Sequence, residues 1–261
     1  MDLNLTGKTA IVVASSQGLG KAIATQLVKE GANVMLASRS EDKLEAVQAE
    51  LSAFNKGKVS YLQTDITKKE DIEALIKHTA DTFGTIDILV NNAGGPPAGT
   101  FDQLDDEAWQ GAFELNLLSY IRMIRGALPH MQKNGGKIIN IASSSIKIPI
   151  PGLILSNTFR LGIVGLSKTL ADELAPYNIL INTVAPGRIA TDRVTHLDNV
   201  RAEKLGKPIE EIERMAKEAI PLKRYGTPEE FANFVTFLVS DANTYMTGQA
   251  YLVDGGSVKA I

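Results

Sequence analysis

Two glycines near the start of the chain could let the backbone approach a phosphate group. They lie in Ser15-Ser16-Gln17-Gly18-Leu19-Gly20, between an apolar run and an amphipathic segment. Glycine permits close backbone approach, and the exposed N–H groups at the start of a helix stabilise negative charge. The segment predicts a pyrophosphate-binding turn, although two glycines that open a helix are often only a tight turn. Ala14 adds a methyl group before it, so we expect close approach only if Ala14 has a negative φ.

A second candidate for phosphate recognition is Arg39, nineteen residues after Gly20. It lies in Ala37-Ser38-Arg39-Ser40, at the end of the second apolar run. An acidic residue here would accept a hydrogen bond from a ribose 2′-hydroxyl, whereas arginine and serine bind a 2′-phosphate. Ser38, Arg39 and Ser40 therefore favour NADP(H) over NAD(H) as cofactor. The alternative is a solvated arginine at the end of a strand.

Short β-branched apolar runs alternate with amphipathic stretches, which is the pattern of a parallel sheet covered on both faces. We expect strands at Thr9–Ala14, Asn33–Ala37, Lys58–Gln63, Ile86–Asn91, Lys137–Ala142, Ile179–Ala185 and Ala250–Val253. We expect helices at Gly20–Glu30, Glu41–Ala53, Lys68–Phe83, Asp105–Met131, Leu155–Ala175 and Pro228–Ser240. The predicted fold class is α/β: a single doubly wound Rossmann domain over residues 1–261, with a seven-stranded parallel sheet and helices on both faces. Ligands of such folds bind at the carboxyl ends of the strands, near the topological switch point.

Composition excludes several classes of partner. The formal net charge of −3 provides no basic field for nucleic acid. There is no cysteine, and the three histidines are dispersed, so we expect no disulfide and no metal site. No apolar run approaches the length of a membrane span, and Met1–Leu5 shows no signal pattern. We expect a cytoplasmic protein with no membrane partner.

Several strings along nearly the whole chain resemble motifs of the short-chain dehydrogenase/reductase (SDR) family. They are the Ser15–Gly20 segment, Asp65, Asn91-Asn92-Ala93-Gly94, Asn116, Ser143, Pro186-Gly187 and Asp254-Gly255-Gly256. The resemblance is closest to the 3-oxoacyl-acyl-carrier-protein reductase branch. It implies a homotetramer or homodimer, because the strand end at Asp254-Gly255-Gly256 packs across a dyad in many SDR proteins. Val13 and Ala14 depart from the family's usual glycine pattern.

The same resemblance implies further cofactor contacts. Asn92, Ala93 and Gly94 resemble the string that lines the cofactor, and Pro186-Gly187 resembles the segment that holds the nicotinamide face. These contacts are expected from Asp65, Ile66, Asn92, Ala93, Gly94, Pro186, Gly187, Ile189 and Thr191. Asp65 resembles the aspartate near adenine, but it is equally well explained as the N-cap of the following helix.

In the SDR family an Asn–Ser–Tyr–Lys tetrad moves a proton while the nicotinamide moves a hydride. Asn116 and Ser143 match its first two members. The family spacing of thirteen residues after the serine places Ser156 where the tyrosine is expected, and Arg160 where the lysine is expected. The expected catalytic residues are Ser143, Asn116, Ser156 and Arg160, with Arg160 also anchoring ribose or substrate.

The departures at Ser156 and Arg160 remove the usual proton donor. A serine hydroxyl is much less acidic and shorter than tyrosine, and arginine effectively never deprotonates. General acid–base catalysis contributes about 10²- to 10⁴-fold in rate, so its loss predicts a slow enzyme rather than none. Substitute donors or anchors would come from Lys147, Arg188, Asp192, Arg193 or His196, and Arg188 beside the nicotinamide end could clamp an anionic substrate.

The leading hypothesis is an atypical oxidoreductase that uses NADP(H) to interconvert a small-molecule carbonyl and alcohol. One alternative is a non-catalytic NADP(H)-binding sensor or scaffold, and another is a cofactor-dependent lyase or isomerase. The charged, helix-prone segment 198–219 resembles the mobile substrate lid of SDR proteins, which we expect at about residues 190–222. No specificity code for the substrate is recognisable there.

Overall fold

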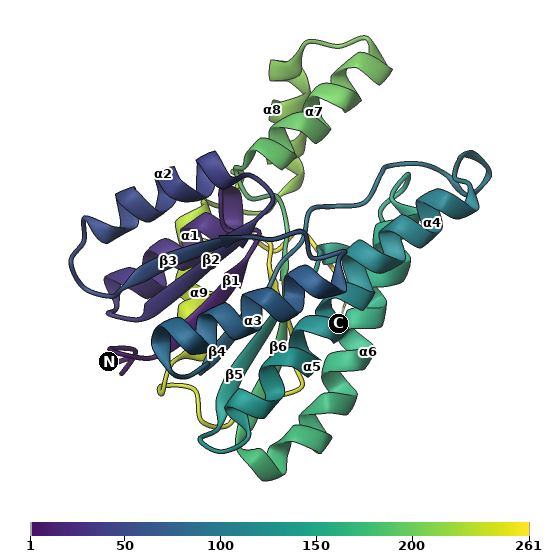
Figure 1. Cartoon of the computed structure of the whole chain (residues 1–261). Helices are drawn as coiled ribbons and strands as arrows, with labels where there is room; N and C mark the ends of the chain where they lie inside the picture. The colour runs from purple at the N-terminus through teal and green to yellow at the C-terminus, as the bar shows by residue number, and fades with distance from the viewer. Residues whose placement is uncertain (1, 261) are drawn as a thin grey trace.

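A sheet of seven parallel strands forms the centre of the molecule, and its helices cover both faces (Figure 1). The computed structural model describes residues 2–260. The strands are β1 Thr9–Val13, β2 Asn33–Ser38, β3 Val59–Gln63, β4 Ile88–Asn91, β5 Gly136–Ile141, β6 Ile179–Pro186 and β7 Ala250–Val253. Their order across the sheet is β3-β2-β1-β4-β5-β6-β7. The predicted seven-stranded doubly wound fold is confirmed.

Two groups of three helices enclose the sheet. One face carries α1 Gly18–Lys29, α2 Glu41–Ser52 and α9 Pro228–Val239. The other face carries α3 Lys69–Phe83, α5 Ser119–Met131 and α6 Ile154–Leu174. Side chains alternate along β1, where Ala10 and Val12 pack against the first group while Ile11 and Val13 pack against the second. Both faces are covered, which explains why the strand is apolar from Ala10 to Val13.

The strand order reverses between β1 and β4, and this switch point determines where a ligand can bind. The chain leaves β1 toward β2 on one side and later returns to β4 on the other, so the connections after the two strands diverge. The divergence opens a crevice at their carboxyl ends. The glycine segment after β1 and the Asn91–Gly94 segment after β4 therefore lie at the same edge of the sheet.

The expected helix over residues 105–131 is wrong as a single element. The structure has α4 at Asp106–Phe113, a π-helical turn at Glu114–Leu118 and then α5. A π turn inserts an extra residue into the helical ladder, and such turns are frequent at functional sites. The apolar pattern continues through the insertion, so it does not show this break. The other expected strands and helices agree with the structure within two residues at each end.

Two further helices, α7 Asp192–Leu205 and α8 Ile209–Ala219, project from the body as a pair at the top of Figure 1. A buried group anchors them. Asp198 of α7 is 1% exposed and forms an ion pair with Arg188, and it accepts a hydrogen bond from the Tyr225 hydroxyl at 2.7 Å. Burial, followed by this bond to Asp198, raises the pKa of Tyr225 to about 12. None of the helices within residues 2–260 is long and apolar enough to span a membrane.

Candidate active site

The turn after β1 has the shape expected of a phosphate-binding loop, but it forms differently from the prediction. Ala14 has a φ of +51°, so the expectation of a negative φ is wrong. The turn is so tight that a Cβ atom on Gly20 would lie 2.2 Å from the carbonyl oxygen of Ala14. Ala14 therefore accepts a left-handed conformation that costs about 1–2 kcal/mol for a residue with a side chain. Gly18 is also left-handed, with a φ of +57°, and a Cβ there would meet only Thr191, at 3.8 Å.

The other residues of this turn serve different purposes. Ser15 is buried, and its Oγ accepts a hydrogen bond from the backbone N–H of Ala37 at 3.0 Å. It thus joins the end of β1 to β2, and its hydroxyl oxygen already has a protein donor. Gln17 is exposed, and its side chain accepts a hydrogen bond from Lys43 at 2.7 Å. Lys43 was not predicted as a site residue. It places a positive charge beside the glycine turn, in addition to that expected from Arg39. The remaining two, Ser16 and Leu19, are half-buried.

Arg39, at the end of β2, is exposed and free to bind an anion. Its carbonyl accepts a hydrogen bond from Gln63, but within residues 2–260 its guanidinium makes no hydrogen bond or ion pair. Ser38 accepts a hydrogen bond from the backbone N–H of Ser40 at 3.3 Å, which shapes the turn into α2. The guanidinium is therefore free to take an anion, and the binding of a 2′-phosphate by Ser38, Arg39 and Ser40 stays a prediction.

The alternative explanation of Asp65 as a helix N-cap is wrong, because the N-cap of α3 is Lys68. The Asp65 carboxylate instead accepts hydrogen bonds from the Thr67 backbone N–H at 3.0 Å and the Thr67 hydroxyl at 2.8 Å. Burial acts to raise the pKa of Asp65, but these bonds, with help from the charges of Arg39 and Lys68, lower it overall. Asp65 is thus an ionised group that closes a turn, and the neighbouring Ile66 is buried in the core.

Three side chains from separate elements bind the loop that follows β4. Their bonds to its carbonyl oxygens are Arg160 to Ala93 at 3.0 Å, Asn116 to Gly94 at 2.8 Å and Arg193 to Pro96 at 3.4 Å. The donors come from α6, the π turn and α7. Asn92, at the start of the loop, is half-buried, and Gly94 is exposed with no atom within 4 Å of an added Cβ. The loop is therefore held through its carbonyl groups, while Gly94 is exposed.

Asn116 lies in the π turn and is completely buried. Its amide nitrogen donates to Gly94, while its Oδ1 atom has no hydrogen-bond partner among residues 2–260. A buried acceptor without a partner is uncommon and favours a bound water or ligand at that place. The free Oδ1 atom leaves a place for such a group beside Asn116, whose catalytic role stays a prediction.

Arg160 is 4% exposed and connects the ends of β4 and β5. Its Nη1 atom donates to the Tyr120 hydroxyl at 2.7 Å and to the Ile141 carbonyl at 2.9 Å. The Tyr120 hydroxyl in turn donates to the same carbonyl at 2.8 Å. Burial raises the pKa of Tyr120 despite the opposing charge of Arg160, so Tyr120 stays neutral and is a poor acid. The sequence did not predict that the Tyr120 hydroxyl accepts a hydrogen bond from Arg160.

The two predicted catalytic serines have different surroundings. Ser143 caps the turn Ser144–Ile146 and its Oγ accepts from the Ser145 backbone N–H at 3.2 Å, so its proton is free to be donated. Ser156 lies in the first turns of α6, one helical turn before Arg160, and is buried. Its hydroxyl makes no hydrogen bond to any residue that the structure describes. Both hydroxyls are thus available to a ligand.

The segment after β6 completes the site. Gly187 is required because a Cβ there would lie 2.6 Å from the Cβ of Asp254. Pro186 is the last residue of β6, and Ile189 is buried. Arg188 binds Asp198 and Tyr225 through its Nη1 atom, which ties it to the anchor of α7, and its use as a clamp for an anionic substrate stays a prediction. The remaining suggested donors are exposed, namely Lys147, Asp192, Arg193 and His196.

Comparisons with known proteins establish the family of the chain. A family model for enoyl-(acyl carrier protein) reductase matches residues 13–258. Glucose 1-dehydrogenase 2 of Bacillus subtilis is 37% identical, over 97% of this chain and 95% of that protein. A 3-oxoacyl-[acyl-carrier-protein] reductase of Staphylococcus epidermidis is 36% identical, over 95% of this chain and 98% of its own. The chain belongs to the short-chain dehydrogenase/reductase family.

Solved SDR structures extend the comparison to a ligand-bound state. L-sorbose reductase from Gluconobacter frateurii, in complex with NADPH and L-sorbose, matches with a TM-score of 0.95 and 35% identity over the full length of both chains. An actinorhodin polyketide ketoreductase with NADPH matches with a TM-score of 0.92 and 30% identity, over 96% of this chain and 97% of that chain. These SDR relatives are oxidoreductases of small molecules.

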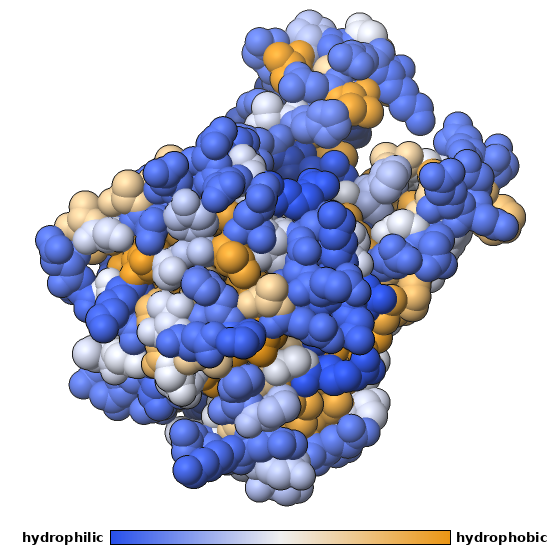
Figure 2. All heavy atoms as spheres, viewed as in Figure 1, coloured by the Kyte–Doolittle hydropathy of each residue, from blue (hydrophilic) through white to orange (hydrophobic). Residues whose placement is uncertain are grey.

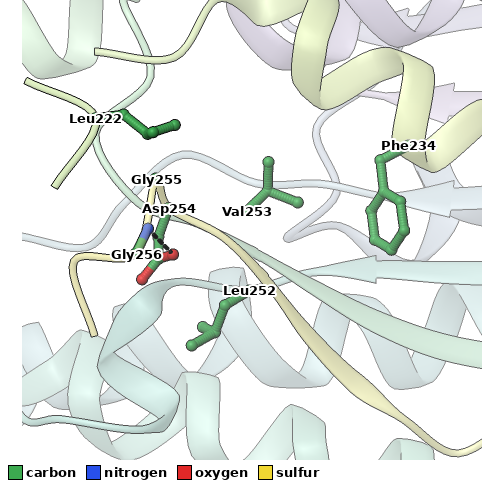
Figure 3. Close-up of a pocket in the computed structure, with 7 residues that line it drawn as sticks. All are labelled: Leu222, Phe234, Leu252, Val253, Asp254, Gly255 and Gly256. Atoms are coloured by element: carbon green, nitrogen blue, oxygen red, sulfur yellow. Dashed lines mark hydrogen bonds between the residues drawn. The ribbon is translucent and has the colours of Figure 1, made fainter. Parts of the chain in front are cut away.

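A cavity of about 610 Å³ lies beside the edge strand β7 and next to the segment after β6, where Asp254 packs against Gly187 (Figure 3). It is lined by Leu222, Phe234, Leu252, Val253, Asp254, Gly255 and Gly256. Its walls are mostly apolar, and the predicted catalytic residues do not line it. The cavity therefore lies at the outer edge of the sheet, next to the segment after β6.

Proposed function

We propose that this protein is an NADP(H)-dependent oxidoreductase that interconverts a carbonyl group and an alcohol on a small molecule. The observation that carries the proposal is the loop after β4, which Arg160, Asn116 and Arg193 hold from three elements while Gly94 remains exposed. This loop lies at the switch point, beside the glycine turn. We propose that the reactive end of the cofactor binds near Ser143 and Ser156, whose hydroxyl protons have no acceptor among residues 2–260.

The residues present fit NADP(H). Gly18 and Gly20 allow a pyrophosphate to approach the start of α1, and the free guanidinium of Arg39 suits a 2′-phosphate. The segment from Pro186 to Thr191 and the open face of Gly94 would hold the nicotinamide end. When bound, the reduced cofactor supplies a hydride to the carbonyl carbon.

The chain's own residues would orient the carbonyl and deliver the proton. Ser143 has a free proton and can donate a hydrogen bond to the carbonyl oxygen. Ser156, with no protein partner, can pass a proton from water to that oxygen, while Asn116 holds the water at its free Oδ1. Arg160 keeps its positive charge and does not give up a proton, so it is not the acid. The carbonyl is thereby reduced to an alcohol, with the proton taken from solvent.

The projecting pair α7 and α8 is proposed to be the substrate lid, within residues 190–222. Its first residues, Thr191 and Arg193, contact the glycine turn and the loop after β4. A movement of the pair would therefore change contacts at the glycine turn and at the loop after β4.

A non-catalytic NADP(H)-binding sensor or scaffold is the second candidate. It is favoured by the bonding of Arg160, because three of its donors are directed to protein acceptors. Tyr120, the one tyrosine bonded to it, is buried with a raised pKa. A lyase or isomerase that leaves the cofactor oxidation state unchanged is the third.

Fluorescence titration with NADPH and NADH, followed by absorbance at 340 nm with ketones, aldehydes and 3-oxoacyl thioesters, separates these functions. The reductase requires tighter binding of NADPH than NADH and loss of absorbance with at least one substrate. Tight binding without oxidation would favour the sensor, and conversion of a substrate without net oxidation would favour the lyase or isomerase. Absence of NADPH binding would reject the cofactor site.

We further propose a homodimer or homotetramer assembled through the β7 edge. All four residues of β7 are only half-buried, and the apolar cavity of Figure 3 lies beside them. An edge strand with an apolar neighbour is a favourable place for a second subunit. Sedimentation velocity tests the assembly, and a concentration-independent monomer would reject it.

A further inference from the structure

Arg160 is a buried cation that lacks a counter-charge. Its three hydrogen bonds go to neutral oxygens, on Tyr120, Ile141 and Ala93. No carboxylate within residues 2–260 lies at ion-pair distance from it. Buried charges in proteins are normally paired, because removing an ion from water costs several kcal/mol. Hydrogen bonds to neutral oxygens offset only part of this cost.

A second cation lies at the same loop. Arg193 is an exposed residue, but its guanidinium rests on the loop after β4, where a Cβ on Gly95 would lie 2.8 Å from its Nη2 atom. It also donates to the Pro96 carbonyl at 3.4 Å. Partial burial, and then the positive charge of Arg160, lower the pKa of Arg193, which remains protonated at neutral pH. The two positive charges therefore repel each other, and neither forms an ion pair with a carboxylate of residues 2–260.

We propose that Arg160 and Arg193 form a site for a carboxylate group of the substrate. The guanidinium of Arg160 has five N–H donors, of which three are used, so that Nε–H and one Nη2–H remain without a protein acceptor in the described chain. Guanidinium groups bind carboxylates through paired parallel hydrogen bonds. The inference rests on the proposed reductase function and narrows its substrates to oxo acids.

The position of the pair favours a substrate over a cofactor phosphate. Arg160 bonds to residues at the ends of β4 and β5, whereas the glycine turn and Arg39 follow β1 and β2, on the other side of the switch point. Arg193 lies in the first turn of α7, where the helix dipole adds positive potential. Figure 2 shows an open notch between the projecting α7–α8 pair and α4, so this side of the molecule is accessible to a ligand. An anion bound there would draw α7 toward the body.

The test compares oxo acids with their methyl esters, which have the same carbonyl group without the charge. Acetoacetate, levulinate and benzoylformate, each beside its methyl ester, are titrated into the NADPH-loaded protein while NADPH fluorescence is followed. The ratio of acid to ester affinity is the readout, and it needs no turnover. We expect at least one acid to bind about tenfold more tightly than its ester, which is the size of effect typical of a charge-assisted contact.

Variants assign this preference to the pair. Arg193→Met is expected to bring the acid-to-ester ratio close to one, and Arg193→Lys to retain part of the preference. Arg201→Met is the matched control, because Arg201 is an exposed arginine of the same helix. It should leave the ratio unchanged. Equal binding of acids and esters by the unmodified protein, or a preference that survives Arg193→Met, would overturn the proposal.

The two proposals fail in different ways. Selective acid binding that is lost in Arg193→Met, but without NADPH oxidation, keeps the carboxylate site and rejects the reductase. Oxidation of NADPH by acids and esters at equal kcat/KM keeps the reductase and rejects the carboxylate site. Weaker NADPH binding in Arg193→Met with an unchanged acid-to-ester ratio assigns the charge to a cofactor phosphate and also rejects it.

Discussion

Replacement of Gly20 by alanine tests the geometry of the turn after β1. An added Cβ would lie 2.2 Å from the Ala14 carbonyl oxygen and 2.8 Å from its carbonyl carbon. Both atoms belong to the backbone, so the turn itself would have to move by about 1 Å. Overpacking of this kind costs about 1–3 kcal/mol, and here we expect the upper end of that range. Better helix propensity returns about 1 kcal/mol, so the expected net loss of unfolding free energy is about 2 kcal/mol.

Gly165→Ala is the matched control. Gly165 is also inside a helix, α6, but it is exposed and has no atom within 4 Å of an added Cβ. Helix propensity alone then predicts a gain of about 1 kcal/mol. Urea unfolding at fixed protein concentration should therefore shift the two midpoints in opposite directions, and NADPH titration should show weaker binding only for Gly20→Ala. A Gly20→Ala protein that is as stable as Gly165→Ala, with unchanged NADPH affinity, would refute the reasoning.

Three further variants test the recognition of the cofactor's charge, the anchor of α7 and the proton donor. Arg39→Asp should weaken NADPH binding at least tenfold and narrow the preference over NADH, measured by fluorescence titration; an unchanged ratio of the two dissociation constants would contradict a 2′-phosphate site. The pKa of Tyr225 is raised to about 12 from 10, so its stabilising effect is present below pH 10 and is lost as the pH rises toward 12. In urea unfolding between pH 9 and 11, the unfolding free energy of Tyr225→Phe should fall less steeply with pH than that of the unmodified protein. An equal fall in the two proteins would contradict the raised pKa of Tyr225. The double variant Ser156→Tyr with Arg160→Lys should raise carbonyl reduction about 10²-fold or more if the tyrosine is the missing acid, and kcat at saturating NADPH measures this; a kcat no higher than the unmodified protein's, in a variant that still binds NADPH, would count against that assignment.

The sheet and its covering helices were predictable because they depend on local patterns. Apolar runs of β-branched residues determine β1 to β7, and the amphipathic segments between them determine the helices. The π turn around Asn116 was not predictable, because it interrupts the helical ladder without interrupting the apolar pattern. The feature that marks the turn is the hydrogen bond from the buried amide of Asn116 to the carbonyl of Gly94. This bond joins residues 22 positions apart, so it is recognised only in the folded structure.

The site was predictable at the level of segments and not of individual bonds. Resemblance indicated the region of Arg160, but its partners Tyr120 and Ile141 lie 40 and 19 residues away in the chain. The same holds for Arg188, whose pairing with Asp198 depends on how α7 packs. Ala14 shows the reverse case, since a local rule predicted its φ and the tight approach of Gly20 overrode that rule.

The anchor at Asp198 determines how α7 and α8 can move. Asp198 lies in the middle of α7 and is joined to Arg188, which precedes the pair, and to Tyr225, which follows it. A closing motion that preserves these bonds must rotate about this point. The seven residues beyond it in α7 then act as a lever arm of about 10 Å. A turn at the anchor would therefore displace Leu205 and α8 in one direction and Arg193, five residues on the other side of Asp198, in the opposite direction, so motion of α8 is coupled to the contact of Arg193 with the loop after β4.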